Sequence, residues 1–406
     1  MINAQNPVIW ADVPDPSVIR VGDTYYMTST TMHMNPGVPV MKSTDLVNWE
    51  IVNYVYDILG DKDEQCLENG KHEYGKGSWA SSLRYHNGMY YVVFSSQTEQ
   101  KTFVFKTRDI ERGPWEKHVL PFLHDMSLLF DDDGRVFLVH GSGDIRLLEL
   151  TPDCAAVKPG GVGQVIIPNS SAVAGPDIAL PAEGAHIHKI NGMYYIFLIT
   201  WPRDGMRTQL CYRAKNILRP WEGRVVLQDE GIAQGGLVDT PDGKWYALLF
   251  GDRGAVGRIP YLVPVRWEAS WPVLGVQGRV PVDTGIAPKQ GLKIVSSDEF
   301  DHGPQLGLVW QWNHNPDNGN WSLTERPGYL RLRTGRISRG LLDARNTLTQ
   351  RTFGPECTGT VAVETAGMRS GDCAGLALLQ QRYGYVGVKV SPSEGSLLEA
   401  AVCWPS

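Results

Sequence analysis

The sequence lacks the features that mark several classes of protein. Its six cysteines are scattered without a CxxC pair, so neither a structural zinc site nor a disulfide framework is indicated. No run approaches the roughly 18 consecutive apolar residues of a membrane-spanning helix, and no membrane association is expected. Basic residues are not in excess: Lys and Arg total 38, Asp and Glu total 44, and the net charge of −6 argues against nucleic-acid binding. Helical periodicity is also scarce, and only residues 59–64 suggest a short helix.

Turn-forming and aromatic residues, by contrast, are abundant. The 406 residues include 44 Gly, 26 Pro and 13 Trp, a composition in which glycine and proline punctuate short strands. Hydrophobic residues make up 42% of the chain, as in a folded globular protein. Because domains commonly have roughly 100–150 residues, the length indicates more than one domain. The predicted fold class is all-β.

One turn motif recurs along the first two-thirds of the chain. Each copy has a glycine, usually preceded by Asn or Asp, and a strand rich in aromatic residues follows it. Such pairs favour hairpins because both residues tolerate positive φ. Successive copies are 46 to 66 residues apart, close to the length of a four-stranded blade with loops, so five copies predict a five-bladed β-propeller. The repeated glycines are Gly22, Gly88, Gly134, Gly192 and Gly243.

Polar residues recur at a nearly constant distance before these glycines. One residue stands nine positions before each of the last four glycines, and another stands seven positions before the first glycine. If the strands are equivalent, these residues all lie at one end of the central channel. Carboxylates brought together there push their pKa values apart, as the acid and base of glycosidic bond hydrolysis require. An aspartate in a PDPS segment also caps turns, which is the alternative for the first position. The residues so found are Asp15, Trp79, Asp125, Glu183 and Gln234.

A different pattern begins near Ser296. Strand-like runs with period-two alternation cover residues 329–334, 359–367, 374–380 and 385–390, separated by Gly and Pro, which predicts a small β-sandwich. The predicted domains are therefore a propeller over residues 1–285 and a sandwich over 294–406. A linker is expected within 280–292.

The segments that carry the acids resemble the motifs of glycoside hydrolase family 43. The resemblance rests on NPVIWADVPDPSVIR, LHDMSLLFDDDG and PAEGAHIHKINGMYYIF, and it extends over roughly residues 5–280. It implies a five-bladed propeller with β-xylosidase or α-L-arabinofuranosidase activity and an inverting mechanism. Asp15 then corresponds to the general base, Glu183 to the general acid, and Asp125 to a third acid that tunes Glu183. Inversion requires the first two carboxyl groups to stand roughly 6.5–9.5 Å apart.

The resemblance also suggests residues that bind the sugar. Arg258, in VGRIPY, matches a sugar-binding arginine of the family, although a blade-edge ion pair would explain it equally. Trp79 is expected to form an apolar wall of the pocket, with a packed core position as the alternative. Met32 and His33 lie on a loop where relatives place a subsite wall.

No cofactor is expected to be required, and a calcium ion in the channel is the one metal considered. Many relatives have a histidine at the position of Gln234 that helps bind a hydrated calcium ion, and glutamine is a poorer, neutral substitute. His186 and His188 alternate along one strand, but no third ligand accompanies them.

The expected function is that of an exo-acting glycosidase that removes terminal pentoses from arabinoxylan or xylo-oligosaccharides. Two alternatives remain: an endo-arabinanase-type hydrolase on the same propeller, and a non-catalytic carbohydrate-binding propeller. The start shows no basic segment followed by an apolar run, which predicts a cytoplasmic protein unless a leader has been removed. Compared with the family, the sandwich is expected to be shortened, and an exposed sheet edge would favour an oligomer.

Overall fold

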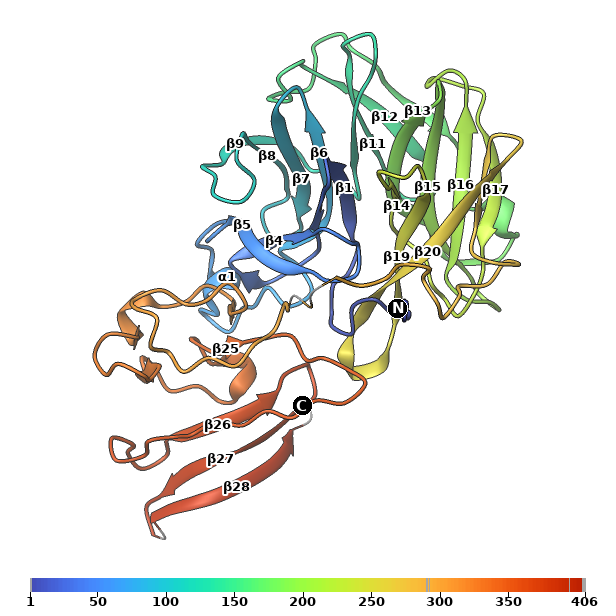
Figure 1. Cartoon of the computed structure of the whole chain (residues 1–406). Helices are drawn as coiled ribbons and strands as arrows, with labels where there is room; N and C mark the ends of the chain where they lie inside the picture. The colour runs from blue at the N-terminus through green and yellow to red at the C-terminus, as the bar shows by residue number, and fades with distance from the viewer. Residues whose placement is uncertain (1, 290, 292, 394, 404–406) are drawn as a thin grey trace. The chain divides into compact units, whose positions relative to one another are not determined.

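The computed structural model describes residues 2–289, 291, 293–393 and 395–403. These residues form five antiparallel sheets of four strands each, arranged as blades, and the predicted five-bladed propeller is confirmed (Figure 1). The helical prediction at 59–64 is met only in part, by the single turn α1 (Asp63–Cys66). Within the described residues, no helix has the length and apolar character that crossing a membrane requires.

In each blade the strands follow one another in chain order from the channel outward. Blade one contains β1 (Ser17–Val21), β2 (Thr24–Thr28), β4 (Gly37–Ser43) and β5 (Glu50–Tyr56). Blade two contains β6 (Ser78–His86), β7 (Met89–Ser96), β8 (Lys101–Thr107) and β9 (Glu116–Pro121). Blade three contains β10 (Ser127–Phe130), β11 (Val136–His140), β12 (Ile145–Leu150) and β13 (Gly163–Ile167). Blade four contains β14 (Ile178–Ile190), β15 (Met193–Pro202), β16 (Thr208–Ala214) and β17 (Glu222–Leu227). Blade five contains β18 (Leu237–Asp239), β19 (Trp245–Asp252), β20 (Arg258–Glu268) and β21 (Trp271–Leu274).

The repeated glycines occupy the turn between the first two strands of every blade. Asn87 and Gly88, for example, have φ of 50° and 77°, the left-handed conformation that a tight hairpin needs. The first strand of each blade therefore begins at the opposite end, where the predicted site residues lie.

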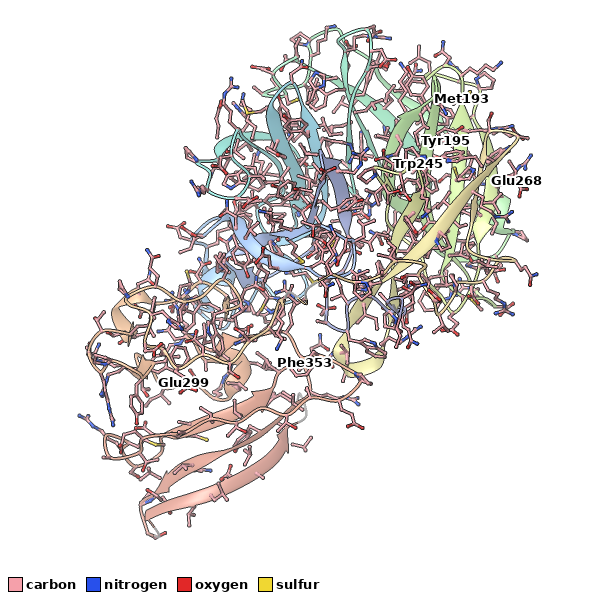
Figure 2. All side chains as sticks on the ribbon, viewed as in Figure 1. Met193, Tyr195, Trp245, Glu268, Glu299 and Phe353 are labelled. Atoms are coloured by element: carbon pink, nitrogen blue, oxygen red, sulfur yellow. The ribbon has the colours of Figure 1, made fainter. Side chains whose placement is uncertain are left out.

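Apolar side chains fill the spaces between neighbouring blades. Between blades four and five, the ring centroid of Trp267 lies 5.2 Å from that of Tyr195 and 5.9 Å from that of Trp245, and Met193 packs in the same cluster (Figure 2). Burial of such aromatic surface contributes about 25 cal/mol per Å². The blades are thus held face to face, which fixes the positions of their innermost strands.

Hydrogen bonds also link each innermost strand to the next. A side chain of one blade accepts a backbone N–H of the following blade at about the same height in the channel, and an ion pair between Arg20 and Asp239 joins blade one to blade five. This ladder sets the relative height of residues from different blades. The acceptor and donor pairs are Ser17 with Leu83, Ser82 with Leu128, Ser127 with Ile187, and His188 with Leu237.

The chain after the propeller adds small elements to the first of two compact units. That unit comprises residues 1–339 and 343–353, since β22 (Gln311–Asn313) pairs with β3 (Met34–Asn35). The predicted boundary between residues 285 and 294 remains a proposal. This part of the chain also contains β23 (Trp321–Ser322), β24 (Arg331–Leu332), β25 (Leu348–Thr349) and η3 (Asn318–Asn320). Two further short turns lie within the propeller, η1 (Ala172–Ala174) between β13 and β14 and η2 (Gly254–Val256) between β19 and β20. The turn η4 (Leu341–Asp343) includes residues of both units.

The second unit comprises residues 340–342 and 354–406 and contains three antiparallel strands: β26 (Cys373–Leu378), β27 (Tyr383–Ser391) and β28 (Gly395–Cys403). Strands were correctly expected within 374–380 and 385–390. The prediction for 359–367 is wrong, because these residues form no strand and are mostly exposed. Alternation alone does not make a strand; a hydrogen-bonded neighbour is also needed. The predicted strand at 329–334 is reduced to the two residues of β24.

Candidate active site

Four of the five residues found by their spacing lie within three residues of the start of an innermost strand, and the fifth, Glu183, lies inside β14. Three of them have left-handed backbone conformations, with φ of 52° at Asp15, 43° at Asp125 and 57° at Gln234. The strand pairing shifts register beside the other two, Trp79 and Glu183. Bulges and strained residues of this kind re-aim side chains and cluster at functional sites. The equivalence inferred from the spacing therefore extends to the local backbone.

Asp15 is buried, and protein groups hold both of its oxygens. Arg258 Nη1 donates a hydrogen bond to Asp15 Oδ1 at 2.9 Å, and the hydroxyl of Thr30 donates to Oδ2 at 2.6 Å. The backbone of Arg258 is held as well, because its N–H donates to Asp12 Oδ1 at 2.7 Å. The carboxylate thus has a single orientation, set by blades one and five.

Asp125 and Glu183 share a second cluster with His124. The His124 Nε2 atom lies 2.9 Å from Glu183 Oε2 and 3.9 Å from Asp125 Oδ2. Burial, helped by the nearby charges of Glu183 and Asp15, raises the pKa of Asp125 to about 7, against the lowering effect of His124. Burial alone would lower the pKa of His124, but the Glu183 hydrogen bond and the Asp125 charge raise it overall. A proton is therefore retained in this cluster near neutral pH.

The repeated spacing does not identify His124. Its signal was available, since it directly precedes Asp125 in the LHDMS segment, but it does not fall at the repeated distance from a glycine. The three groups offer oxygen and nitrogen atoms that all lie within 4.8 Å of one another, a spread that one metal ion would fit. The hydrogen bond between His124 and Glu183 already satisfies two of these groups without an ion.

Trp79 and Gln234 complete the surroundings of Glu183. The Trp79 ring meets the His124 ring edge to face, with centroids 5.6 Å apart. The Gln234 side chain packs on Gly184, where an added Cβ would come within 2.8 Å of it. Gly184 has φ of 67°, so both space and backbone conformation require glycine beside Glu183.

Comparison with known proteins identifies the family of the chain. Residues 4–272 match the family described as Glycosyl hydrolases family 43, and residues 297–403 match the one described as Beta xylosidase C-terminal Concanavalin A-like domain. The chain belongs to glycosyl hydrolase family 43. The expected glycosidase class, and a propeller followed by a β-sandwich domain, are thereby confirmed.

Several proteins and one solved structure are similar in sequence to most of this family 43 chain. A beta-xylosidase from Formosa agariphila is 30% identical over 458 residues, covering 95% of this chain and 74% of that protein. A non-reducing end alpha-L-arabinofuranosidase from Bacteroides ovatus is 30% identical over 357 residues, covering 81% and 64%. A solved structure described as Bifunctional GH43-CE from Bacteroides eggerthii has a TM-score of 0.96 and 55% identity over 99% of this chain. The chain spans 52% of that structure, about half its length.

The loop residues Met32 and His33 of this family 43 chain lie next to β6. The backbone of Met32 exchanges two hydrogen bonds with Ser78, at 2.9 and 3.1 Å, which places Met32 beside the start of the strand that carries Trp79. The His33 ring instead contacts Tyr74 and His314, with centroids 4.7 and 4.9 Å away, and burial lowers its pKa to about 4. No described contact joins His33 to the acids, and a sugar-binding role for either residue remains a prediction.

The channel of this family 43 propeller does not suit a calcium ion. Arg84 donates hydrogen bonds to the carbonyls of Leu128, Leu83 and Ile187 at 2.8, 2.7 and 2.9 Å, and among the described residues it forms no ion pair. Burial, and then the Arg84 charge, lowers the pKa of His186 to about 3. A divalent cation near this uncompensated guanidinium would be repelled, so these residues do not fit a calcium ion. His188 is also unsuited as a ligand, since its Nε2 accepts a backbone N–H at 3.1 Å.

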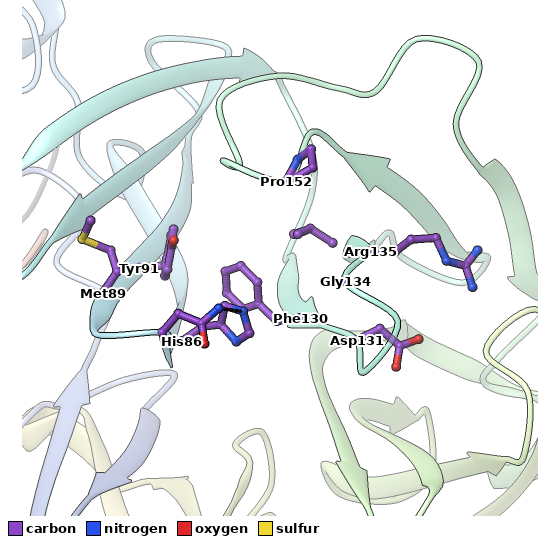
Figure 3. Close-up of a pocket in the computed structure, with 10 residues that line it drawn as sticks. His86, Met89, Tyr91, Phe130, Asp131, Gly134, Arg135 and Pro152 are labelled. Atoms are coloured by element: carbon purple, nitrogen blue, oxygen red, sulfur yellow. Dashed lines mark hydrogen bonds between the residues drawn. The ribbon is translucent and has the colours of Figure 1, made fainter.

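A separate cavity of about 300 Å³ opens at the hairpin end of blades two and three (Figure 3). The stacked rings of His86 and Phe130 lie 4.2 Å apart within its lining, and Asp131 and Arg135 also line it. The three acids lie at the other end of the propeller, away from the hairpins between the first two strands of the blades. This cavity is therefore distinct from the candidate active site.

Proposed function

We propose that this family 43 chain is an exo-acting, inverting glycoside hydrolase that releases terminal arabinofuranose or xylose from arabinoxylan or xylo-oligosaccharides. The observation that carries the proposal is the convergence of Asp15, Asp125 and Glu183 from three blades at one end of the channel. The names of the two curated relatives, a beta-xylosidase and an alpha-L-arabinofuranosidase, support the pentose specificity.

In the proposed mechanism the cluster around Asp15 supplies the general base, and the cluster around Glu183 supplies the general acid. Asp15, oriented by Arg258 and Thr30, removes a proton from the attacking water. Glu183, oriented by His124, donates a proton to the oxygen of the leaving group. The water attacks one face of the sugar while the leaving group departs from the other, which inverts the configuration of the anomeric carbon.

Asp125 acts on the sugar and on Glu183 without forming a covalent bond. With its pKa raised to about 7, it carries a proton near neutrality and donates a hydrogen bond to a sugar hydroxyl. Asp125 also borders the side chain that orients Glu183, since its Oδ2 atom lies 3.9 Å from His124 Nε2.

The test compares hydrolysis of p-nitrophenyl β-D-xylopyranoside and α-L-arabinofuranoside by wild type and Glu183→Gln. Wild type should cleave at least one substrate, and the variant should lose at least about 1000-fold in kcat/KM on it. Glu222→Gln, a change of the same kind on exposed strand β17 of the same blade, is the control and should retain full activity. No cleavage by folded wild type, or an active Glu183→Gln variant, would refute the proposal.

A further inference from the structure

An exposed tryptophan lies at the end of blade four that carries Glu183. Trp201 is on β15, two residues beyond Ile199, which pairs with Glu183 across the strands. Alternate residues of a strand share a face, so Trp201 projects to the same side as Ile199, whose side chain packs against Phe250 of blade five. Trp201 is nevertheless 38% exposed, whereas Ile199 and Phe250 are fully buried.

The Trp201 ring is held in place by polar contacts. Its indole N–H donates to the carbonyl of Gly205 at 3.1 Å. The guanidinium of Arg207 lies 5.4 Å from the Trp201 ring centroid and 5.5 Å from that of Phe250. A ring fixed before binding loses little conformational entropy when a ligand packs on it. Trp201 is thus a pre-organised aromatic surface.

A series of side chains with alternating positive and negative charge connects the Trp201 ring with Asp15, the proposed general base. Arg207 Nη1 lies 2.9 Å from Asp252 Oδ2, and Asp252 Oδ1 lies 3.8 Å from Arg258 Nε. Arg258 in turn donates to Asp15. Trp201 therefore belongs to the same continuous set of side chains as the acid-lined opening.

These contacts point to a second sugar-binding position. We propose that Trp201, supported by Arg207, binds the xylopyranose ring on the leaving-group side of the bond that is cleaved. The inference rests on the proposed function, in which Glu183 protonates the leaving oxygen, because the sugar attached to that oxygen then lies on the Glu183 side of the pocket. The C–H face of a pyranose ring packs on an indole ring, which makes Trp201 a determinant of oligosaccharide preference.

The experiment compares a one-sugar and a multi-sugar substrate. Wild type, Trp201→Ala and Trp201→Phe are assayed on a pentosyl fluoride, whose leaving group has no ring, and on xylo-oligosaccharides that carry the same terminal pentose. Trp201→Ala should lose about tenfold in kcat/KM on the oligosaccharide, mainly through KM, and less than about twofold on the fluoride. Trp201→Phe should retain most of the oligosaccharide activity.

The control is Tyr85→Ala, which removes an aromatic side chain that is 44% exposed near the hairpin end of blade two. It should change neither activity. An unchanged oligosaccharide activity in Trp201→Ala, or an equal loss on both substrates, would overturn the proposal. If Trp201→Ala does not fold, Trp201→Leu supplies the same comparison. Failure of wild type to cleave either substrate would instead refute the proposed function itself.

Discussion

His124 and Glu183 form a hydrogen bond that joins blade three to blade four, with Nε2 and Oε2 2.9 Å apart. The His124 ring also contacts the Trp79 ring edge to face. The proposed general acid is therefore positioned by a side chain from a different blade. Its orientation depends on the packing of the two blades as well as on its own strand.

Replacing His124 should impair catalysis through Glu183. His124→Phe keeps a ring beside Trp79 but removes the hydrogen bond, and we expect kcat to fall about tenfold with a smaller change in KM. His124→Gln should recover part of the loss, since its amide still reaches the carboxylate. The check is a pH profile of kcat for all three proteins. Profiles of identical shape and height would show that His124 does not act on Glu183.

Asp125 makes stability depend on pH with a defined sign. Its pKa in the folded protein, about 7, lies above its ordinary value of 3.8, so the folded state holds a proton that the unfolded state has released between these values. The stabilisation is complete below about pH 4 and is lost as the pH rises through 7. In the Asp125→Asn variant no group titrates at this position, so this loss of folding stability at high pH does not occur.

The difference in melting temperature between Asp125→Asn and wild type should therefore be near zero at about pH 4 and favour the variant by about 2–4 °C at pH 8. Activity of the variant should fall sharply at both pH values. A pH-independent difference in melting temperature would contradict the raised pKa of Asp125.

We expect the melting temperature to depend on Arg84 and not on a bound metal ion. Arg84→Met leaves three buried carbonyls without a donor, each at a cost of about 1–3 kcal/mol, and we expect the melting temperature to fall by several degrees. A chelator should leave the melting temperature of wild type unchanged, and added calcium should not raise it. A drop of several degrees in wild type on chelation, reversed by calcium, would contradict the incompatibility of the channel with this ion.

Substitutions of Gly184 and Gln234 should have non-additive effects on the free energy of unfolding. Gly184→Ala puts a methyl group against the Gln234 side chain and strains a backbone with φ of 67°, which should cost about 2 kcal/mol or more and lower activity. Combined with Gln234→Ala, the same change should cost less, because the contact is removed and only the strain remains. Urea unfolding of the four proteins measures the coupling. Strictly additive losses would show that the contact is not the cause.

The sequence predicted the propeller and the positions of the acids because both depend on local features. A hairpin turn needs specific residues at adjacent positions, and five such turns at similar spacing also set the start of each innermost strand. His124, Arg84 and Trp201 escaped prediction because their roles depend on contacts with other blades. The wrong strand at 359–367 has the same cause, since pairing partners are distant in the chain.

The central claim is that Asp15 and Glu183 act as base and acid on opposite faces of the sugar. Proton NMR during the first minutes of hydrolysis, before the released sugar mutarotates, tests it most directly. The account predicts that an α-arabinofuranoside first releases β-arabinose, or that a β-xyloside first releases α-xylose. Initial release of the sugar with its original anomeric configuration would contradict it.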